Sequence, residues 1–284
     1  MEKLSVVGGI VTFNPDIARL RENLQASVGQ LESLVVVDNN STNLSDIEAI
    51  AREFPAVIVL ANRSNGGMAK ALNQIMSWAA TIRASHVLLL DQDSVIGNSM
   101  VAELRAHVGP GVGIVCPAVL DRSAMDETID RGLPSEVNYC ITSGSLCSVD
   151  AWAFVGGYDD GLFIDFVDFD FCLRLRHCDF RIIREPKSTL LHEIGKITRH
   201  GPLTAYHHSA FRSYHMARDM IFYSYKNRAS RRELLVQRRG LAGTYAILLR
   251  KALIVALFEE DRLHRVTSLI RGMISGTFAL RRVE

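Results

Sequence analysis

The chain has 284 residues, of which 48% are hydrophobic, and a formal net charge of +1. This length and composition can build one large α/β domain, or one domain with an appendage, and they exclude a disordered chain. A net charge near zero lacks the strong positive charge that is typical of a dedicated nucleic-acid-binding protein. The five cysteines form no CxxC pair and are odd in number, which argues against a zinc site and a complete disulfide framework and favours a reducing compartment.

Four apolar runs in the first third of the chain predict strands separated by helices. The runs cover residues 4–13, 34–37, 57–60 and 87–90, and helices are predicted after Asn14-Pro15-Asp16 and from residue 67 to about Arg83. Alternating strands and helices imply βαβ units and a mostly parallel sheet with right-handed crossovers. The carboxyl ends of parallel strands meet at one edge, so a site is expected at that edge, among Thr12, Asp38, Asn62 and Asp91.

The sequence Asp91-Gln92-Asp93 directly follows the apolar run 87–90. Two carboxylates at the end of a buried strand suit Mg²⁺ or Mn²⁺, which proteins usually hold through one or two carboxylates plus substrate phosphates. Aspartate is also common in solvated turns, so a turn without a metal is the alternative.

Two further polar segments are candidates for binding a nucleotide. Asp38-Asn39-Asn40-Ser41 can hydrogen-bond a base and a ribose, although Asx turns use the same residues. Asn65-Gly66-Gly67 opens a helix, where free backbone N–H groups and the helix dipole can receive phosphate. A plain capped helix is the alternative, and the spacing of a P-loop is absent.

The second half of the chain is less regular. Strands are predicted at 111–117, at 139–149 and from Arg181, and the pattern becomes helical from about Thr204. Between them, residues 163–174 alternate apolar residues with Asp165, Asp168 and Asp170. Burial would raise the pKa of such a carboxylate and favour a general base, whereas pairing with Arg174 or Arg176 would lower the pKa.

Of these carboxylates, Asp168 is the better base candidate, and a structural salt bridge is the main alternative for Asp170. His192 follows the strand that begins at Arg181 and could complete a metal site through an imidazole nitrogen. A structural role for this histidine is the alternative.

Basic residues concentrate near the C-terminus, where residues 226–284 hold thirteen Lys or Arg against five Asp or Glu. The apolar stretch 245–258 contains Arg250 and Lys251, so it is expected to be too short and too charged to span a bilayer. It suits a basic amphipathic helix at an anionic lipid surface, or a helix packed on the catalytic domain or on a second copy. The N-terminus lacks the cleavage region of a signal peptide, so the expected location is the cytoplasm, with peripheral contact at the inner face of the plasma membrane.

Together, these motifs resemble glycosyltransferase family 2, which has the GT-A fold, over about residues 4–220. Within that family the chain looks most like bacterial rhamnosyltransferases, which carry similar VTYN, VDNxS, NxGxAxAxN, DQD and FIDxVDxxFCLR segments. The chain differs from many family members at two places. Val167 stands where many members have Glu. In the segment 214–219, which resembles a YYxxRN box, His215 and Asp219 replace the second Tyr and the Asn.

The resemblance implies a role for each motif residue. Asp168 would be the catalytic base, and Asp93 and His192 would hold Mg²⁺ or Mn²⁺. Ser143, Gly144 and Asp170 would bind the acceptor. The donor nucleotide and diphosphate would be bound by Thr12, Asn14, Asp38, Asn40, Asn65, Gly66, Asp91, Gln92 and Arg218.

The implied organisation is a GT-A catalytic domain over residues 1–220, with a nucleotide-binding part at about 1–95 and an acceptor-binding part at about 96–220. A basic helical region, 221–284, would contact a membrane surface or form a homodimer. The implied activity is inverting transfer of L-rhamnose from dTDP-L-rhamnose to a saccharide or lipid-linked saccharide during synthesis of a cell-surface polysaccharide.

Three alternatives stay open. The donor could be a UDP-sugar, such as UDP-linked glucose, galactose or galactofuranose. A nucleotidyltransferase should carry an N-terminal Gly-rich basic loop, and Gly8-Gly9 inside an apolar strand is not that loop. A non-catalytic sugar-nucleotide-binding subunit would bind donor without turnover.

Overall fold

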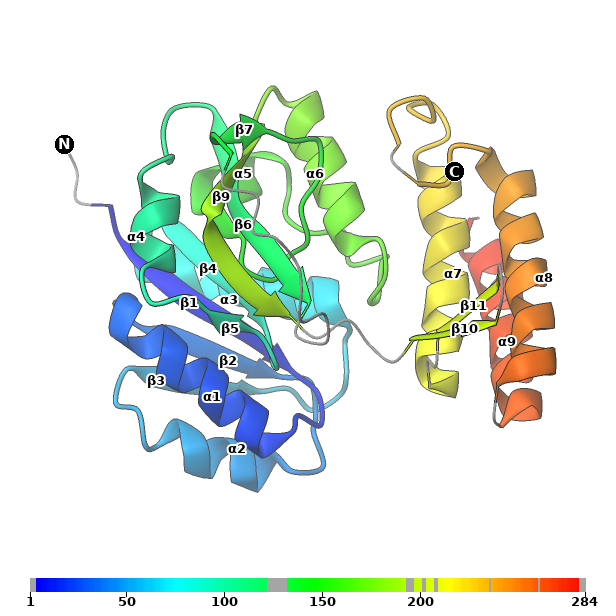
Figure 1. Cartoon of the computed structure of the whole chain (residues 1–284), viewed down its shortest axis with the longest axis horizontal. Coiled ribbons are helices and arrows are strands. Elements are labelled where there is room, and N and C mark those ends of the chain that lie inside the picture. The colour runs from blue at the N-terminus through cyan, green and yellow to red at the C-terminus, as the bar shows by residue number, and fades with distance from the viewer. Residues whose placement is uncertain are drawn as a thin grey trace. The chain divides into compact units, whose positions relative to one another are not determined.

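The structure, a computed structural model, describes residues 4–121, 132–192, 197–200, 203–206, 209–234, 236–259 and 261–280. The chain divides into two compact units, drawn together in Figure 1. The first unit contains residues 1–159 and 171–194, and the second contains residues 160–170 and 195–284.

The first unit alternates strands and helices over its N-terminal half. In chain order its elements are β1 (Val6–Thr12), α1 (Ile17–Ser27), the short 3₁₀ helix η1 (Val28–Gln30), β2 (Leu34–Asp38), α2 (Leu44–Ala51), β3 (Val57–Ala61), α3 (Met68–Thr81), β4 (His86–Asp91), β5 (Val95–Ile96), α4 (Met100–Arg105), β6 (Val112–Asp121), β7 (Ser135–Glu136), β8 (Leu146–Ser148), α5 (Val149–Phe154) and β9 (Arg181–His192). Helix α6 (Val167–His177) begins among the residues of the second unit.

These strands form one sheet in the order β3-β2-β1-β4-β8-β6-β9-β5, with β7 paired to β9. The predicted parallel strands are confirmed, because β3, β2, β1 and β4 all pair in parallel. Beyond β4 the sheet is mixed: β8 is antiparallel to β4 and to β6, and β5 and β7 are antiparallel to β9. Strand β6 pairs in parallel with β9. The expectation of a mostly parallel sheet is therefore only partly confirmed, because the pairs made by β8, β5 and β7 are antiparallel.

The sheet is covered by helices on both faces, as continuous apolar strands require. Val6 and Ile10 of β1 pack in one core cluster with Leu20 and Leu24 of α1. On the opposite face a Cβ at Gly9 would lie 2.2 Å from Ile75 of α3, so that helix approaches the backbone of β1 closely. Figure 1 shows α1 in front of the sheet and α3 behind it.

Strand register places the predicted polar residues at one edge of the sheet. Thr12 pairs with Asp38, and Val11 pairs with Asp91, so β1, β2 and β4 end side by side. One predicted strand is wrong in extent: of 139–149 only Leu146–Ser148 is a strand. Gly144 has φ 80° in the turn before it, a left-handed conformation that glycine adopts without steric cost.

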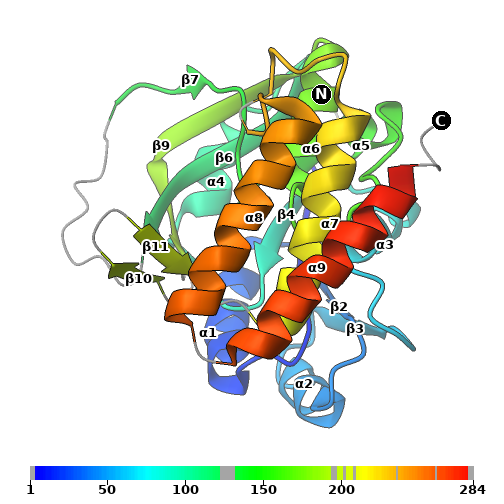
Figure 2. The same ribbon diagram turned by 90° about the vertical axis from the view of Figure 1, so that its right-hand side faces the viewer.

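The second unit is built around three helices, α7 (Ala210–Lys226), α8 (Gly240–Phe258) and α9 (Arg262–Ala279), which lie side by side in Figure 2. It also contains a two-stranded sheet of β10 (Ile197–His200) and β11 (Leu203–Tyr206), so the helical region begins later than the predicted Thr204. The helices share a core that includes Ile221, Leu248 and Leu269.

Helix α8 has 19 residues and a mean hydropathy of 1.7 over its most apolar window, of which 17% is buried. By length and composition it could cross a membrane. The prediction that the stretch is too short to do so is wrong, because the helix begins at Gly240 rather than Tyr245. It still carries Arg250 and Lys251 near its middle.

Candidate active site

Asp38 organises the end of β2. Its carboxylate is fully buried and accepts hydrogen bonds from the Thr12 hydroxyl (2.9 Å), the Ser41 N–H (2.8 Å) and the Ser41 hydroxyl. In this arrangement both oxygens are occupied by neighbouring residues. Asp38 therefore fixes the shape of the edge, and because its side chain is fully buried it is not accessible to a nucleobase in this arrangement.

Asn14 and Asn40, at the same edge, are exposed to solvent. Both have positive φ, 48° and 66°, which asparagine tolerates better than most residues. The Asn14 N–H donates to the Ser41 hydroxyl (2.7 Å), and the Asn14 side-chain oxygen accepts from the Thr42 N–H (2.8 Å). Gln92 joins the same edge, because its side-chain oxygen accepts the Phe13 N–H at 2.9 Å. These side chains are accessible to a base or ribose.

The glycine turn before α3 has the predicted form. The Asn65 side chain accepts the Gly67 N–H at 2.9 Å, and Gly67 adopts φ 89° as the residue that precedes the helix. No side chain caps the N-terminus of α3. Free N–H groups at a helix start can receive an anion, as predicted for Asn65 and Gly66.

A hydrogen-bonded cluster lies at the end of β4. The Asp91 N–H donates to the Ser143 hydroxyl (3.0 Å), which lies 2.7 Å from the Ser94 hydroxyl. Ser94 in turn lies 3.2 Å from Nδ1 of His192, and that nitrogen is 3.9 Å from the Asp91 carboxylate. Three segments distant in sequence are thus brought together, and four polar side chains meet there.

The oxygen and nitrogen atoms of this cluster and of the neighbouring Asp93 are suitable ligands for a divalent cation. Metal-bound histidines usually have one ring nitrogen held by a second polar group, and Ser94 holds Nδ1 in this way, which leaves Nε2 for a metal. The Asp93 carboxylate makes no hydrogen bond or ion pair with any residue that the structure describes. Within the described ranges no three metal-binding side chains gather, so a cation would need substrate oxygens to complete its shell.

Gly144 lies where a side chain would not fit. A Cβ at this position would be 2.9 Å from Pro117 and 3.1 Å from Leu190, and its φ of 80° is left-handed. The Gly144 N–H donates to the Leu89 carbonyl at 2.7 Å, which joins the turn to β4. Ser143 is 1% exposed, so the hydroxyl that contacts Asp91 belongs to the interior of the site.

Asp168 and Asp170 belong to the second unit. Asp168 is half-buried in the first turn of α6, and its carboxylate accepts the Phe169 N–H at 2.8 Å. Asp170 is fully buried and forms an ion pair with Lys226 of α7 at 2.7 Å. The structural salt bridge expected as the alternative for Asp170 is therefore present, and Lys226 was not foreseen as its partner. Its acceptor role stays a prediction.

Arg218, also in the second unit, pairs with the neighbouring Asp219 (Nη1 to Oδ1, 2.7 Å). The other oxygen of Asp219 accepts the backbone N–H groups of Phe163 and Ile164, both at 2.9 Å, and of Asp165 at 3.3 Å. Asp219 is fully buried, and this burial raises its pKa to about 6 although these donors oppose the shift. One carboxylate therefore fastens the chain just before Asp168 to α7.

His215 supports the same segment from one turn earlier in α7. Its ring stacks on Phe163 with centroids 3.6 Å apart. Burial, together with the positive charge of Arg218, lowers the pKa of His215 to about 4, so the stacked ring is neutral near neutral pH.

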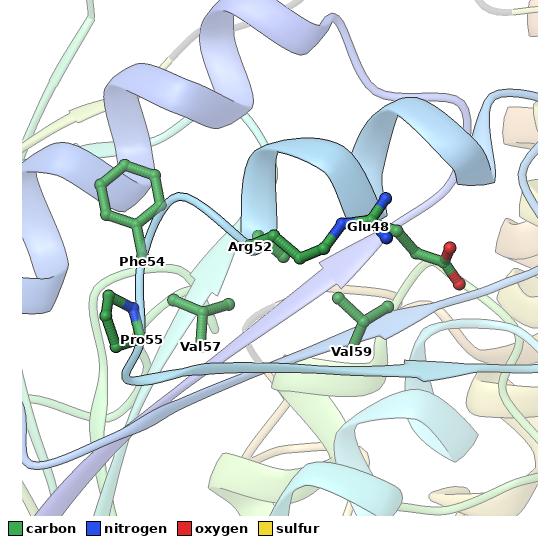
Figure 3. A pocket seen from close by; sticks show the side chains of 7 residues that line it. Glu48, Arg52, Phe54, Pro55, Val57 and Val59 are labelled. Carbon is green, nitrogen blue, oxygen red and sulfur yellow. The ribbon is translucent and has the colours of Figure 1, made fainter.

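A pocket of about 390 Å³ lies elsewhere in the first unit (Figure 3). It is lined by Glu48 of α2, by Arg52, which directly follows that helix, by Phe54 and Pro55 of the loop, and by β3. It lies beside the start of β3, whereas the predicted donor residues follow the ends of strands. The pocket is therefore separate from the site described above.

Two residues of these networks were missed by sequence reasoning. Ser94 bridges Ser143 and His192, and its one signal is that it directly follows Asp93. Asp219 anchors Arg218 and the segment before Asp168. In the sequence, the only indication of Asp219 is that it replaces the Asn of the YYxxRN box.

The family model for glycosyl transferase family 2 matches residues 9–152, just over half of the chain. A curated relative, the dTDP-rhamnosyl transferase RfbF of Shigella flexneri, is 28% identical over 239 residues, which cover 77% of this chain and 79% of RfbF.

Two solved structures share the fold. TarS 1–349 of S. aureus in complex with UDP-GlcNAc aligns with 98% of this chain and 82% of its own, at 15% identity and a TM-score of 0.55. GalNAc-T7 with UDP, GalNAc and Mn²⁺ aligns with 68% of this chain and 45% of its own, also at 15% identity and a TM-score of 0.55. The chain therefore belongs to glycosyl transferase family 2 and is a glycosyltransferase of the GT-A fold, similar to a bacterial dTDP-rhamnosyl transferase.

Proposed function

We propose that this glycosyltransferase moves L-rhamnose from dTDP-L-rhamnose to a saccharide acceptor with inversion at the anomeric carbon. The observation that carries the donor assignment is the similarity to RfbF, which extends over more than three quarters of both chains.

The residues around the end of β4 support binding of the donor diphosphate with a divalent cation. Asp93 and His192 would hold Mg²⁺ or Mn²⁺, and Asp91 would lie beside them. When bound, the cation neutralises the charge that develops on the departing phosphate oxygens. Thr12, Asp38 and the exposed asparagines at that edge would shape the nucleoside part of the site.

Asp168 is proposed as the catalytic base. It would take the proton of the acceptor hydroxyl while that oxygen attacks the anomeric carbon from the face opposite the leaving group. The bond to the nucleoside diphosphate breaks as the new glycosidic bond forms, so the configuration inverts and no covalent enzyme intermediate arises. Arg218 would add a positive charge beside the diphosphate, and Ser143, Gly144 and Asp170 would shape the acceptor site.

The acceptor is proposed to be a growing or lipid-linked saccharide of a cell-surface polysaccharide, reached from the cytoplasm by peripheral contact with the membrane. The proposed division of labour is a catalytic domain over residues 1–220 and a contact region over 221–284. This proposal rests on the basic charge of the C-terminal region and on the similarity to RfbF.

Thermal denaturation of the full chain with different nucleotide sugars tests the donor. With Mn²⁺ present, dTDP-rhamnose should raise the Tm more than dTDP-glucose or a UDP-sugar does, since a ligand that binds only the folded state stabilises it by mass action. EDTA should remove most of the shift. A larger shift with UDP-glucose, UDP-galactose or UDP-galactofuranose would replace the rhamnose assignment, and donor binding without any transfer would indicate a non-catalytic subunit.

A further inference from the structure

The surface of α8 and α9 is unusually apolar for the outside of a protein. Of the large hydrophobic side chains that are exposed among the described residues, half lie on these two helices. On α8 the residues Leu249, Leu253 and Leu257 recur every four positions and are 58–61% exposed. On α9, Leu263, Ile270, Ile274 and Phe278 form a second stripe, 47–81% exposed.

Both stripes point away from the core that the helices share. Leu248 and Val255 of α8 are buried in that core, and they lie on a different face of the helix from the exposed Leu249 and Leu253. Leu269 of α9 is likewise buried. The exposed stripes are therefore a surface left over after the three helices in Figure 2 have packed.

The polar groups around the stripes are basic. Eight arginines between residues 226 and 280 are exposed, against two exposed acidic residues, Glu233 and Asp261, among the described part of this region. Arg250 and Arg271 lie beside the apolar stripes, and Arg238, Arg239 and Arg262 lie near the helix ends. Long arginine side chains can keep their charge in the lipid headgroup region while their carbon chains lie against apolar surface.

Buried contacts hold helix α8 in the three-helix bundle, and these contacts would be lost if the helix spanned a bilayer. Thr244 is fully buried and donates to the Gln237 side chain at 2.8 Å. Lys251 faces inward, with Nζ 3.0 Å from Met216 Sδ, and its burial lowers its pKa. A spanning α8 would expose both polar groups to lipid and remove Leu248 and Val255 from the core, so a position flat on a surface is favoured.

Charge decides between a lipid surface and a second copy of the chain. In a symmetric dimer the same patch would face itself, which would bring the arginines of one copy toward those of the other. A bilayer with anionic headgroups has the complementary charge, and each basic residue near it contributes attraction. We infer that the exposed face of α8 and α9 docks the enzyme on an anionic membrane, where it would reach a lipid-linked acceptor. This deepens the proposed function and rests on it only for the nature of the acceptor.

Flotation of the full chain with vesicles tests the docking without measuring transfer. Equimolar phosphatidylglycerol and phosphatidylcholine should carry the protein upward at low salt, and phosphatidylcholine alone should carry much less. Combined Leu253→Glu and Leu257→Glu should lower the partition more than about tenfold, because two leucines that the proposed docking would place in the lipid are lost. Arg250→Gln should lower it about fivefold at low salt, and less at high salt.

Leu133→Glu is the matched control, since Leu133 is 86% exposed in the first unit and should leave flotation unchanged. Circular dichroism and Tm confirm that each variant is folded. Wild-type protein that fails to float with anionic vesicles overturns the proposal, as does flotation that the double leucine variant leaves intact. Light scattering that shows a dimer, dissociated by the leucine substitutions, in a protein that does not float would assign the face to a second copy. A protein that floats but transfers no sugar would refute the transfer proposal alone.

Discussion

Replacing Asp219 by Asn and by Ala should separate two tasks that one buried carboxylate performs. An asparagine can keep its side-chain carbonyl toward the N–H groups of Phe163 and Ile164, because a carbonyl also accepts hydrogen bonds. It cannot accept from Arg218 with its NH₂ group. Alanine removes both contacts.

The sizes of the two effects follow from the contacts. Asp219→Ala leaves at least two buried N–H groups without an acceptor, at about 1–3 kcal/mol each, so the free energy of unfolding should fall by about 2–6 kcal/mol. In the wild type, the rise of the Asp219 pKa from 3.8 to about 6 corresponds to about 3 kcal/mol that the ionised form costs the fold above that pKa. Asp219→Asn avoids this penalty, so near neutral pH it should be as stable as the wild type or more stable.

The pH dependence gives an independent check. Because the folded state holds the proton of Asp219 more tightly than the unfolded state, this group stabilises the fold fully below its unfolded pKa of 3.8 and loses that contribution as pH rises toward about 6. The wild type should therefore gain stability relative to Asp219→Asn as pH falls through this window. The charges of Arg218 and Asp165 also act on Asp219, and neither residue is substituted in the two variants.

Urea denaturation of the three proteins across this pH range measures the free energies directly. Steady-state transfer should also show a donor KM raised about tenfold or more in Asp219→Asn, because Arg218 has lost its charge-assisted partner. Equal destabilisation by Asn and Ala, or a stability difference between wild type and Asp219→Asn that does not change with pH, would refute the reasoning.

Three further outcomes are expected. Asp168→Asn should lower kcat by about 10²-fold or more while dTDP-rhamnose binding, measured by calorimetry, stays unchanged; turnover within a few-fold of wild type would contradict the base assignment. Gly272→Ala should lower the free energy of unfolding by about 1–3 kcal/mol, because the new Cβ would lie 2.2 Å from the Tyr214 carbonyl oxygen. Urea denaturation measures this change. An unchanged urea midpoint would show that α7 and α9 can separate at little cost. Under native conditions a thiol reagent should modify Cys178 quickly and the other four cysteines only on unfolding, since all five are free and only Cys178 is exposed; a second fast thiol would contradict this.

The N-terminal half of the fold was predictable because its signals are local. Each apolar run at 34–37, 57–60 and 87–90 became a strand within one residue of its predicted ends. A parallel strand buried on both faces needs a continuous apolar sequence, and nothing outside the segment is required to recognise it. The shared edge of Thr12, Asp38 and Asp91 followed from the same reasoning.

The rest depended on contacts between distant segments. The antiparallel insertion of β8 is not encoded in the pattern of Leu146–Ser148, since a short apolar run does not state its pairing direction. Asp170 forms an ion pair with Lys226, 56 positions away, and nothing in the segment around Asp170 indicates that lysine. Asp219 acts on residues 54–56 positions earlier, so its neighbours could not be read from its own segment.

The hydrogen-bonded cluster at the end of β4 has a consequence for when this part of the fold forms during synthesis. Ser94 joins Ser143, 49 positions later, and His192, 98 positions later. Contacts of such long sequence separation close large loops and form slowly. A nascent chain that has emerged only as far as residue 152 holds the whole segment matched by the family model but lacks His192. The cluster is thus completed only after β9 has been synthesised and has joined the sheet, so partially made chains cannot assemble it.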